Sequence, residues 1–95
     1  MKAANVFRHA SKQNDGTFLS LSEKVKVIED GTEVERWESN IISASPAAEA
    51  KFDEACSKGF ARFTAKGVPF ITIDLDKSVV EKMDDKVLLV SFTLA

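Results

Sequence analysis

Residues 45–67, SPAAEAKFDEACSKGFARFTAKG, carry the strongest local signal in the chain. Ser45 suits an N-cap because its hydroxyl accepts a backbone N–H bond, and Pro46 follows where no N–H donor is needed. Gly67 can take the left-handed conformation that ends a helix. Apolar residues recur between these ends at three- and four-residue spacing, which is typical of an amphipathic helix. The stretch therefore predicts one long helix over residues 46–66.

Alternating polar and apolar residues before this helix indicate strands. The pair Asp30-Gly31 favours a hairpin between two of them, because both residues tolerate the positive φ that a two-residue turn requires. A second turn is expected at residues 13–16, where Asn, Asp and Gly cluster. The three predicted strands cover residues 3–10, 17–28 and 33–43.

The segment after the helix predicts a strand at residues 68–75, a short helical turn at 77–83 and a buried strand at 87–94. The chain is then a single α+β domain over residues 1–95. We expect an antiparallel or mixed sheet of about five strands packed on the long helix, in the order β-β-β-α-β-(short α)-β. The predicted core comprises Phe52, Cys56, Phe63, Ile71, Ile73, Val90 and Phe92.

Composition limits the classes of function. The chain has 95 residues, 44% hydrophobic and 29% charged, with a net charge of −2, so it is neither a uniformly basic nucleic-acid binder nor a uniformly acidic DNA mimic. A single cysteine excludes an intrachain disulfide and suits a reducing compartment. No apolar stretch approaches the roughly 20 residues that a bilayer requires. We expect a cytoplasmic protein with no membrane contact.

An acidic segment follows the predicted hairpin turn, and Trp37 lies inside it. Tryptophan and arginine dominate the energetic centres of protein interfaces, and nearby carboxylates steer a basic partner. The alternative is that Trp37 packs in the core under the helix. The predicted site for a protein partner with a basic surface consists of Glu33, Glu35, Arg36, Trp37 and Glu38.

Basic residues on the predicted helix offer a different interpretation, a nucleic-acid interface. Cations at a spacing of four residues would form a stripe along one helical face and could track phosphates. The simpler explanation is that they complement the helix dipole and aid solubility. The candidate residues are Lys51, Lys58, Arg62 and Lys66.

Aspartates give a third hypothesis, a metal-dependent enzyme. Asp74 and Asp76 share one strand face, and Asp84 with Asp85 follows after a short connection. Clustered carboxylates can bind Mg²⁺. The alternative assigns Asp76 to a helix cap and the remaining aspartates to turns. Because chemistry-bearing residues are otherwise few, we expect no cofactor and no resident metal.

His9 and Cys56 are the only histidine and cysteine, too few for a zinc site, and Cys56 is expected to behave as a small apolar residue. Elimination therefore favours a non-catalytic protein-binding module, such as a phage or mobile-element inhibitor or adaptor. A homodimer is also compatible with the sequence.

Overall fold

The computed structural model describes residues 2–11 and 16–95, which form six strands and one helix. The first three strands lie where the sequence predicts them. The turn predicted at residues 13–16 falls outside the described residues, except for Gly16. The elements are β1 Ala3–Ala10, β2 Thr17–Glu29, β3 Thr32–Ala44, α1 Pro46–Ser57, β4 Arg62–Phe63, β5 Pro69–Met83 and β6 Lys86–Leu94.

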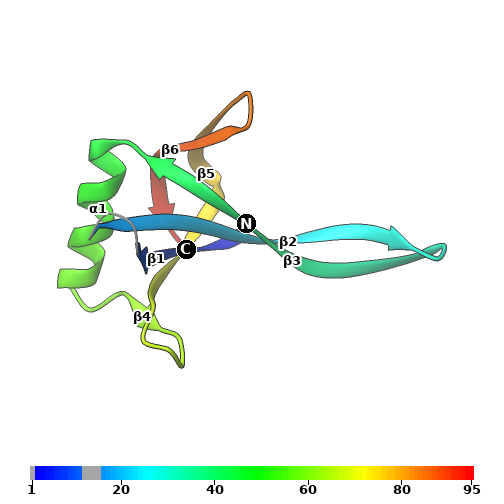
Figure 1. The fold of residues 1–95 in the computed structure, drawn as a ribbon, viewed down its shortest axis with the longest axis horizontal. Helices are drawn as coiled ribbons and strands as arrows, with labels where there is room; N and C mark the ends of the chain where they lie inside the picture. Colours follow the sequence, from blue (N-terminus) through cyan, green and yellow to red (C-terminus); the bar gives the residue numbers. More distant parts are fainter. Residues whose placement is uncertain (1, 12–15) are drawn as a thin grey trace.

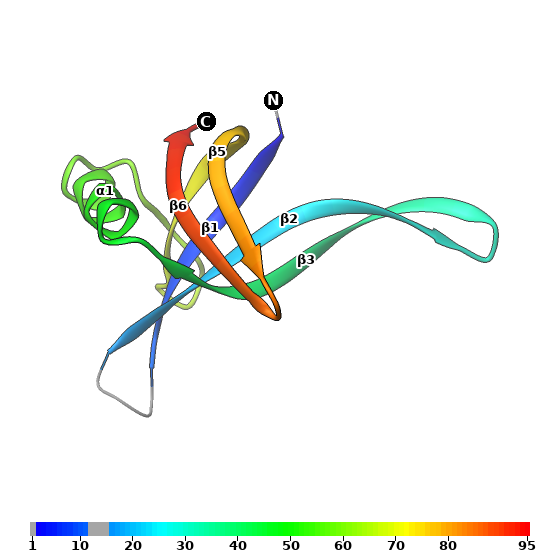
Figure 2. The ribbon, with the colours of Figure 1, turned by 90° about the horizontal axis from the view of Figure 1, so that it is seen from above.

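Five of the strands close into a barrel (Figures 1 and 2). Their order is β1-β2-β3-β6-β5, and β1 also pairs antiparallel with β5, from Ala3↔Asp74 to Phe7↔Phe70. A short parallel pairing between β3 and β6, at Ser43↔Leu88 and Ala44↔Leu89, connects the two antiparallel parts of the barrel wall. A five-stranded Greek-key barrel with this connectivity has the OB-fold architecture. The expected α+β sheet packed on a long helix is therefore wrong, because the sheet closes on itself.

Helix α1 ends at Ser57, nine residues before the predicted end at residue 66. Gly59 has φ +79° and sits just after the cap residue. Its N–H donates to the carbonyl of Cys56, and the N–H of Phe60 donates to the carbonyl of Ala55. These two bonds form a Schellman motif, the commonest glycine-based way of ending a helix. The long-helix prediction failed because Gly59 was placed within the helix and Gly67 at its end.

The N-terminal cap of the helix is confirmed. The Ser45 hydroxyl accepts from the N–H of Ala48 at 3.1 Å and donates to the carbonyl of Val90 at 2.6 Å. The cap therefore attaches the start of α1 to strand β6. No helix in the described residues is long and apolar enough to cross a membrane.

The helical turn predicted at residues 77–83 is also wrong, because β5 continues as a strand to Met83. A bulge shifts its register against β6 between Asp74 and Val79. At this bulge the Ser78 hydroxyl donates to the carbonyl of Asp74 at 2.7 Å. The first half of β5 thus belongs to the barrel wall, and the second half forms a hairpin with β6.

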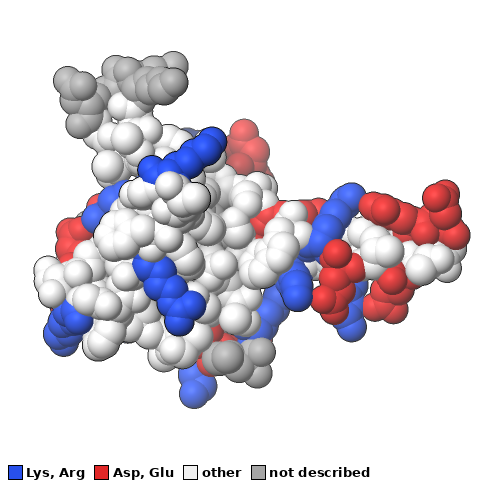
Figure 3. Space-filling model, turned by 90° about the horizontal axis from the view of Figure 1, so that it is seen from below, with Lys and Arg blue, Asp and Glu red and all other residues white. Residues whose placement is uncertain are grey.

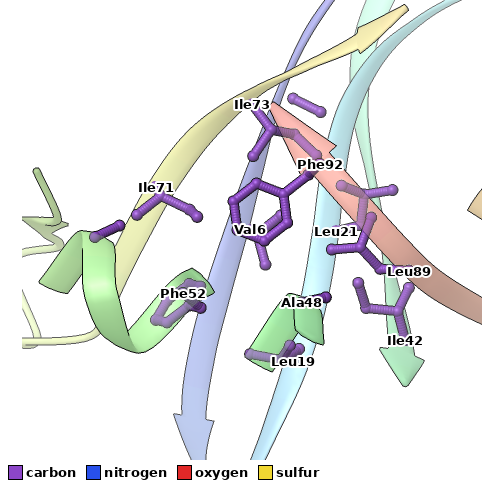
Figure 4. Close-up of a cluster of buried hydrophobic side chains, with 12 residues drawn as sticks. Val6, Leu19, Leu21, Ile42, Ala48, Phe52, Ile71, Ile73, Leu89 and Phe92 are labelled. Carbon is purple, nitrogen blue, oxygen red and sulfur yellow. The ribbon is translucent and has the colours of Figure 1, made fainter. Parts of the chain in front are cut away.

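The core lies inside the barrel, and α1 covers one of its ends (Figure 4). Arg8 on β1 reaches the helix, with its guanidinium 4.3 Å from the centre of the Phe52 ring and 2.5 Å from the Asp53 carboxylate. Of the predicted core, Phe52, Ile71, Ile73 and Phe92 are buried, which confirms them, whereas Cys56 and Val90 are half-buried and Phe63 is 68% exposed.

The β2–β3 hairpin extends well beyond the barrel (Figures 1 and 2). Strand β1 accompanies β2 only as far as Glu23, and β6 joins β3 only at Ser43 and Ala44. Residues 24–38 therefore form a two-stranded projection, called the arm below. Its turn is the predicted Asp30-Gly31 pair, with φ +51° and +77°, as the hairpin geometry requires.

Two phenylalanines test where the core lies. Phe52→Ala should lower the free energy of unfolding by about 3–5 kcal/mol, because it leaves a cavity under the helix. Phe63→Ala should change it by no more than about 0.5 kcal/mol, because that ring faces solvent. Urea unfolding followed by circular dichroism measures both values. Equal losses in the two variants would contradict this assignment of the core.

Candidate functional site

Aromatic side chains line the outer face of the barrel. Inward residues such as Val6 and Leu19 alternate with outward ones along each strand, so Phe7 and His9 on β1 and Phe18 on β2 point away from the core. The ring centres of Phe7 and His9 lie 6.0 Å apart, and those of His9 and Phe18 lie 4.9 Å apart, with nearly parallel planes. Phe70 on β5 continues the series, 4.9 Å from Phe7.

Strand register places a further apolar side chain beside these rings. Phe70 is opposite Phe7, Phe7 is opposite Ser20, and Ser20 is opposite Ile41, which is 72% exposed. This row crosses four strands of the barrel. We call the surface formed by Phe7, His9, Phe18, Ile41 and Phe70 the platform.

Polar side chains form the neighbouring row on the same face. The Thr72 hydroxyl donates to Asn5 Oδ1 at 2.8 Å, and the hydroxyls of Ser22 and Ser39 are hydrogen-bonded to each other. His9 Nε2 lies 2.8 Å from Ser20 Oγ, which fixes the imidazole between its two phenyl neighbours. These bonds hold the outward side chains in place.

A groove of about 710 Å³ runs over four of the five platform residues, Phe7, His9, Phe18 and Ile41, and Phe70 lines the adjoining pocket. One wall is the loop after β4, in which Thr64 accepts N–H bonds from Gly67 and Val68. Lys66 in this loop borders the groove, and Arg62 is paired opposite Phe70 at the other side of the row. None of the residues lining the groove is acidic, and no ion pair is recorded for either cation among residues 2–11 and 16–95.

The predicted protein-binding residues all lie on the arm, but on two faces. Trp37 is 54% exposed, so the alternative that it packs in the core under the helix is wrong. Its face also carries Glu33 and Glu35, whereas Arg36 and Glu38 belong to the opposite face. The five residues therefore do not form one continuous surface within a single chain.

Most of the acidic charge on the arm has a cationic neighbour. Lys24 lies 3.6 Å from Glu35, and Lys26 lies 3.5 Å from Glu33. Arg36 lies 3.0 Å from Glu29. Figure 3 shows the result, an arm with both signs of charge close together beside a barrel with more scattered charges. These ion pairs weaken the negative electrostatic potential of the arm, which was expected to steer a basic partner.

The predicted basic stripe does not exist, because the helix ends at Ser57. Lys51 donates to the carbonyl of Phe92, and Lys58 donates to Glu54 at 2.6 Å. That hydrogen bond and the Lys58 charge lower the pKa of the Glu54 carboxyl. Of the four predicted residues, only Arg62 and Lys66 lie beside the platform.

The four aspartates also remain apart. Asp74 is buried in the barrel wall, where Oδ1 accepts from the N–H of Asp76 at 3.1 Å. Asp84 and Asp85 form the β5–β6 turn, beyond the far end of the strand. No group of three or more metal-ligating side chains occurs in the described part of the chain. His9 and Cys56 are likewise separated, on the platform and on α1.

The platform was missed because most of the phenylalanines were assigned to the core. Strand parity gives the signal that could have found it. On β1, Phe7 and His9 alternate with Val6 and Arg8, and on β2, Phe18 adjoins the inward Leu19. Aromatic residues on the face opposite the core residues are the expected sign of an exposed aromatic surface.

Comparisons with known proteins identified no relative: no family model, no curated protein and no solved structure matched the chain. The function must therefore be argued from the side chains themselves.

The separation of the aspartates gives a prediction about metals. Millimolar Mg²⁺ or Mn²⁺ should leave the Tm unchanged, because a ligand stabilises the folded state only through a site that exists there. Thermal unfolding with and without metal measures this. A rise in Tm that disappears in Asp74→Asn would restore the metal-enzyme hypothesis.

Proposed function

We propose that the protein binds single-stranded nucleic acid across the platform. The observation that carries this proposal is the series of rings Phe7, His9 and Phe18 in an open groove, which Phe70 continues beside Arg62 in the adjoining pocket. Every base has a flat face that stacks on aromatic side chains, so such a surface takes unpaired bases of any sequence. A duplex hides these faces, and we therefore expect single strands to be preferred.

Charge near the groove supports a phosphate backbone there. Lys66 borders the groove and Arg62 flanks Phe70, while the carboxylates of the arm are paired with its own cations. The net charge of −2 therefore does not describe the platform, whose lining includes no acidic side chain. With two cations beside the groove, binding should be modest and sensitive to salt.

The polar row indicates weak sequence preference. The side chains of Asn5 and Thr72 bond to each other, as do those of Ser22 and Ser39, so few of their groups remain to read base edges. OB-fold barrels often bind oligonucleotides on the face of their second and third strands. That is an analogy between folds, and it adds support without carrying the proposal.

Neither the structure nor the comparisons support an inhibitor or adaptor of phage or mobile-element origin, and we do not propose one. Binding to another protein through the arm, and a cytoplasmic location, stay predictions.

Removing one ring tests the platform. Phe18→Ala should weaken binding of a labelled 20-nucleotide oligo-dT or oligo-U about 5- to 150-fold, since one base–aromatic stack is worth about 1–3 kcal/mol. Fluorescence anisotropy at low salt measures this affinity. Phe18→Trp should keep it, because indole also stacks.

The matched control is Val79→Ala, which truncates an exposed apolar side chain on the β5–β6 hairpin. It should leave the affinity unchanged. Absence of binding in the wild-type protein at low salt, or equal losses in Phe18→Ala and Val79→Ala, would refute the proposal. Tighter binding to duplex than to single strands would do the same.

Removing a cation tests the phosphate contacts. Lys66→Ala or Arg62→Ala should each reduce the slope of log affinity against log salt by about 0.7, the value for one phosphate contact on a single strand. The control Lys86→Ala, at the distal β5–β6 turn, should leave the slope unchanged. A slope unaffected by either platform variant would mean that the backbone runs elsewhere.

A further inference from the structure

One edge of the arm is open along strand β3. From residue 33 to residue 39, β3 pairs with β2 on one side, and no described strand pairs with it on the other. Alternate residues of an edge strand direct their N–H and C=O groups outward, where they are a template for another strand. A two-stranded ribbon is also only marginally stable in water, so an added strand would stabilise the arm.

The two edges of the arm differ in composition. The β2 edge carries Lys24 and Lys26, and lysine is a common means of blocking edge pairing. Residues 32–39 of β3 contain no lysine, proline or glycine. Both edges carry β-branched residues, namely Val25, Val27 and Ile28 on β2 and Val34 on β3. The β3 edge differs in carrying charges of both signs, Arg36 among glutamates, so it can be complementary to a second copy of itself.

We propose that this edge pairs with the same edge of a second copy, antiparallel and centred on Trp37. In this register Trp37 lies opposite the partner's Trp37. One residue away on either side, Arg36 lies opposite the partner's Glu38, and Glu38 lies opposite the partner's Arg36. Aromatic pairs and pairs of opposite charge are the favourable cross-strand neighbours in antiparallel sheets.

Neighbouring registers bring like charges together. If the pairing is centred on Arg36, the guanidinium groups of the two copies lie opposite each other. If it is centred on Glu35 or Glu38, two carboxylates lie opposite each other. If it is centred on Val34, Glu33 of each copy lies opposite Glu35 of the other copy. Within one chain Arg36 Nη1 donates to Glu29 at 3.0 Å, whereas Nη2 lies 3.9 Å from Glu38, so Nη2 and the Glu38 carboxylate are the groups that can pair with a partner.

The resulting dimer is closed, because each copy uses its single open β3 edge. The two-fold axis is perpendicular to the sheet, so the outward faces of both copies lie on the same side of the combined sheet. Trp37 lies on the platform's side of the sheet, so the tryptophan pair would connect two platforms. Dimer formation is independent of nucleic-acid binding, and either can fail without the other.

The oligomeric state gives the first test. A contact between two single strand edges is small and therefore weak, so sedimentation equilibrium should cover concentrations from about 1 μM to about 500 μM. We expect a reversible monomer–dimer equilibrium without nucleic acid. Emission from the single tryptophan should shift to the blue as the dimer forms. A monomer throughout this range would overturn the proposal.

Self-crosslinking tests the register, with Cys56→Ala as background. Trp37→Cys should form a disulfide-linked dimer on mild oxidation, because directly opposite Cβ atoms are about 4.5–5.5 Å apart. Glu35→Cys is the matched control, because in this register its two copies are offset by about 13 Å along the strands. Faster crosslinking through Glu35→Cys than through Trp37→Cys, or equal rates in both, would overturn the register.

A charge exchange tests the flanking pairs. Arg36→Glu alone should weaken dimerisation at least tenfold, because it opposes carboxylates across the two-fold axis. The double variant Arg36→Glu with Glu38→Arg should recover much of the loss. Lys86→Glu, at the β5–β6 turn outside the arm, is the control and should not affect the dimer. No recovery in the double variant would refute the Arg36–Glu38 pairing.

Discussion

The antiparallel pairing of β1 with β5 is the interaction on which the rest of the structure depends. It joins Ala3 to Asp74 and Phe7 to Phe70, positions far apart in the chain. This pairing encloses the core residues Val6, Ile71 and Ile73 and removes two sheet edges at once. It also brings Phe70 beside Phe7, so closure of the barrel and assembly of the platform are one event.

Local signals in the sequence predicted part of the local structure. The Ser45 cap, the Asp30-Gly31 turn and the first three strands were all predicted, because each depends on neighbouring residues. The closed sheet could not be read in this way, because β1–β5 pairing leaves no short-range pattern. The end of the helix was misjudged between two glycines that both have positive φ, Gly59 and Gly67.

The candidate site was predicted only in fragments. Arg62 and Lys66 were singled out as cations that could meet phosphate, on a helix that does not extend to them, and the structure places them beside the platform. The aromatic residues were seen but assigned to the core, since inward and outward faces are known only once the register is known. Trp37 was predicted to bind a partner, and the structure adds that it is exposed on an open strand edge.

Gly59, at the end of helix α1, has a backbone conformation that suits a D-amino acid. A Cβ atom added to Gly59 would meet no other atom within 4 Å, so the site has room for a side chain. What disfavours an L-residue is the backbone itself, because φ +79° is a conformation natural to the mirror-image series. A D-alanine introduced there by chemical synthesis would fit both the space and the backbone. It would also restrict the unfolded chain more than glycine does, and so stabilise the barrel without a single new contact.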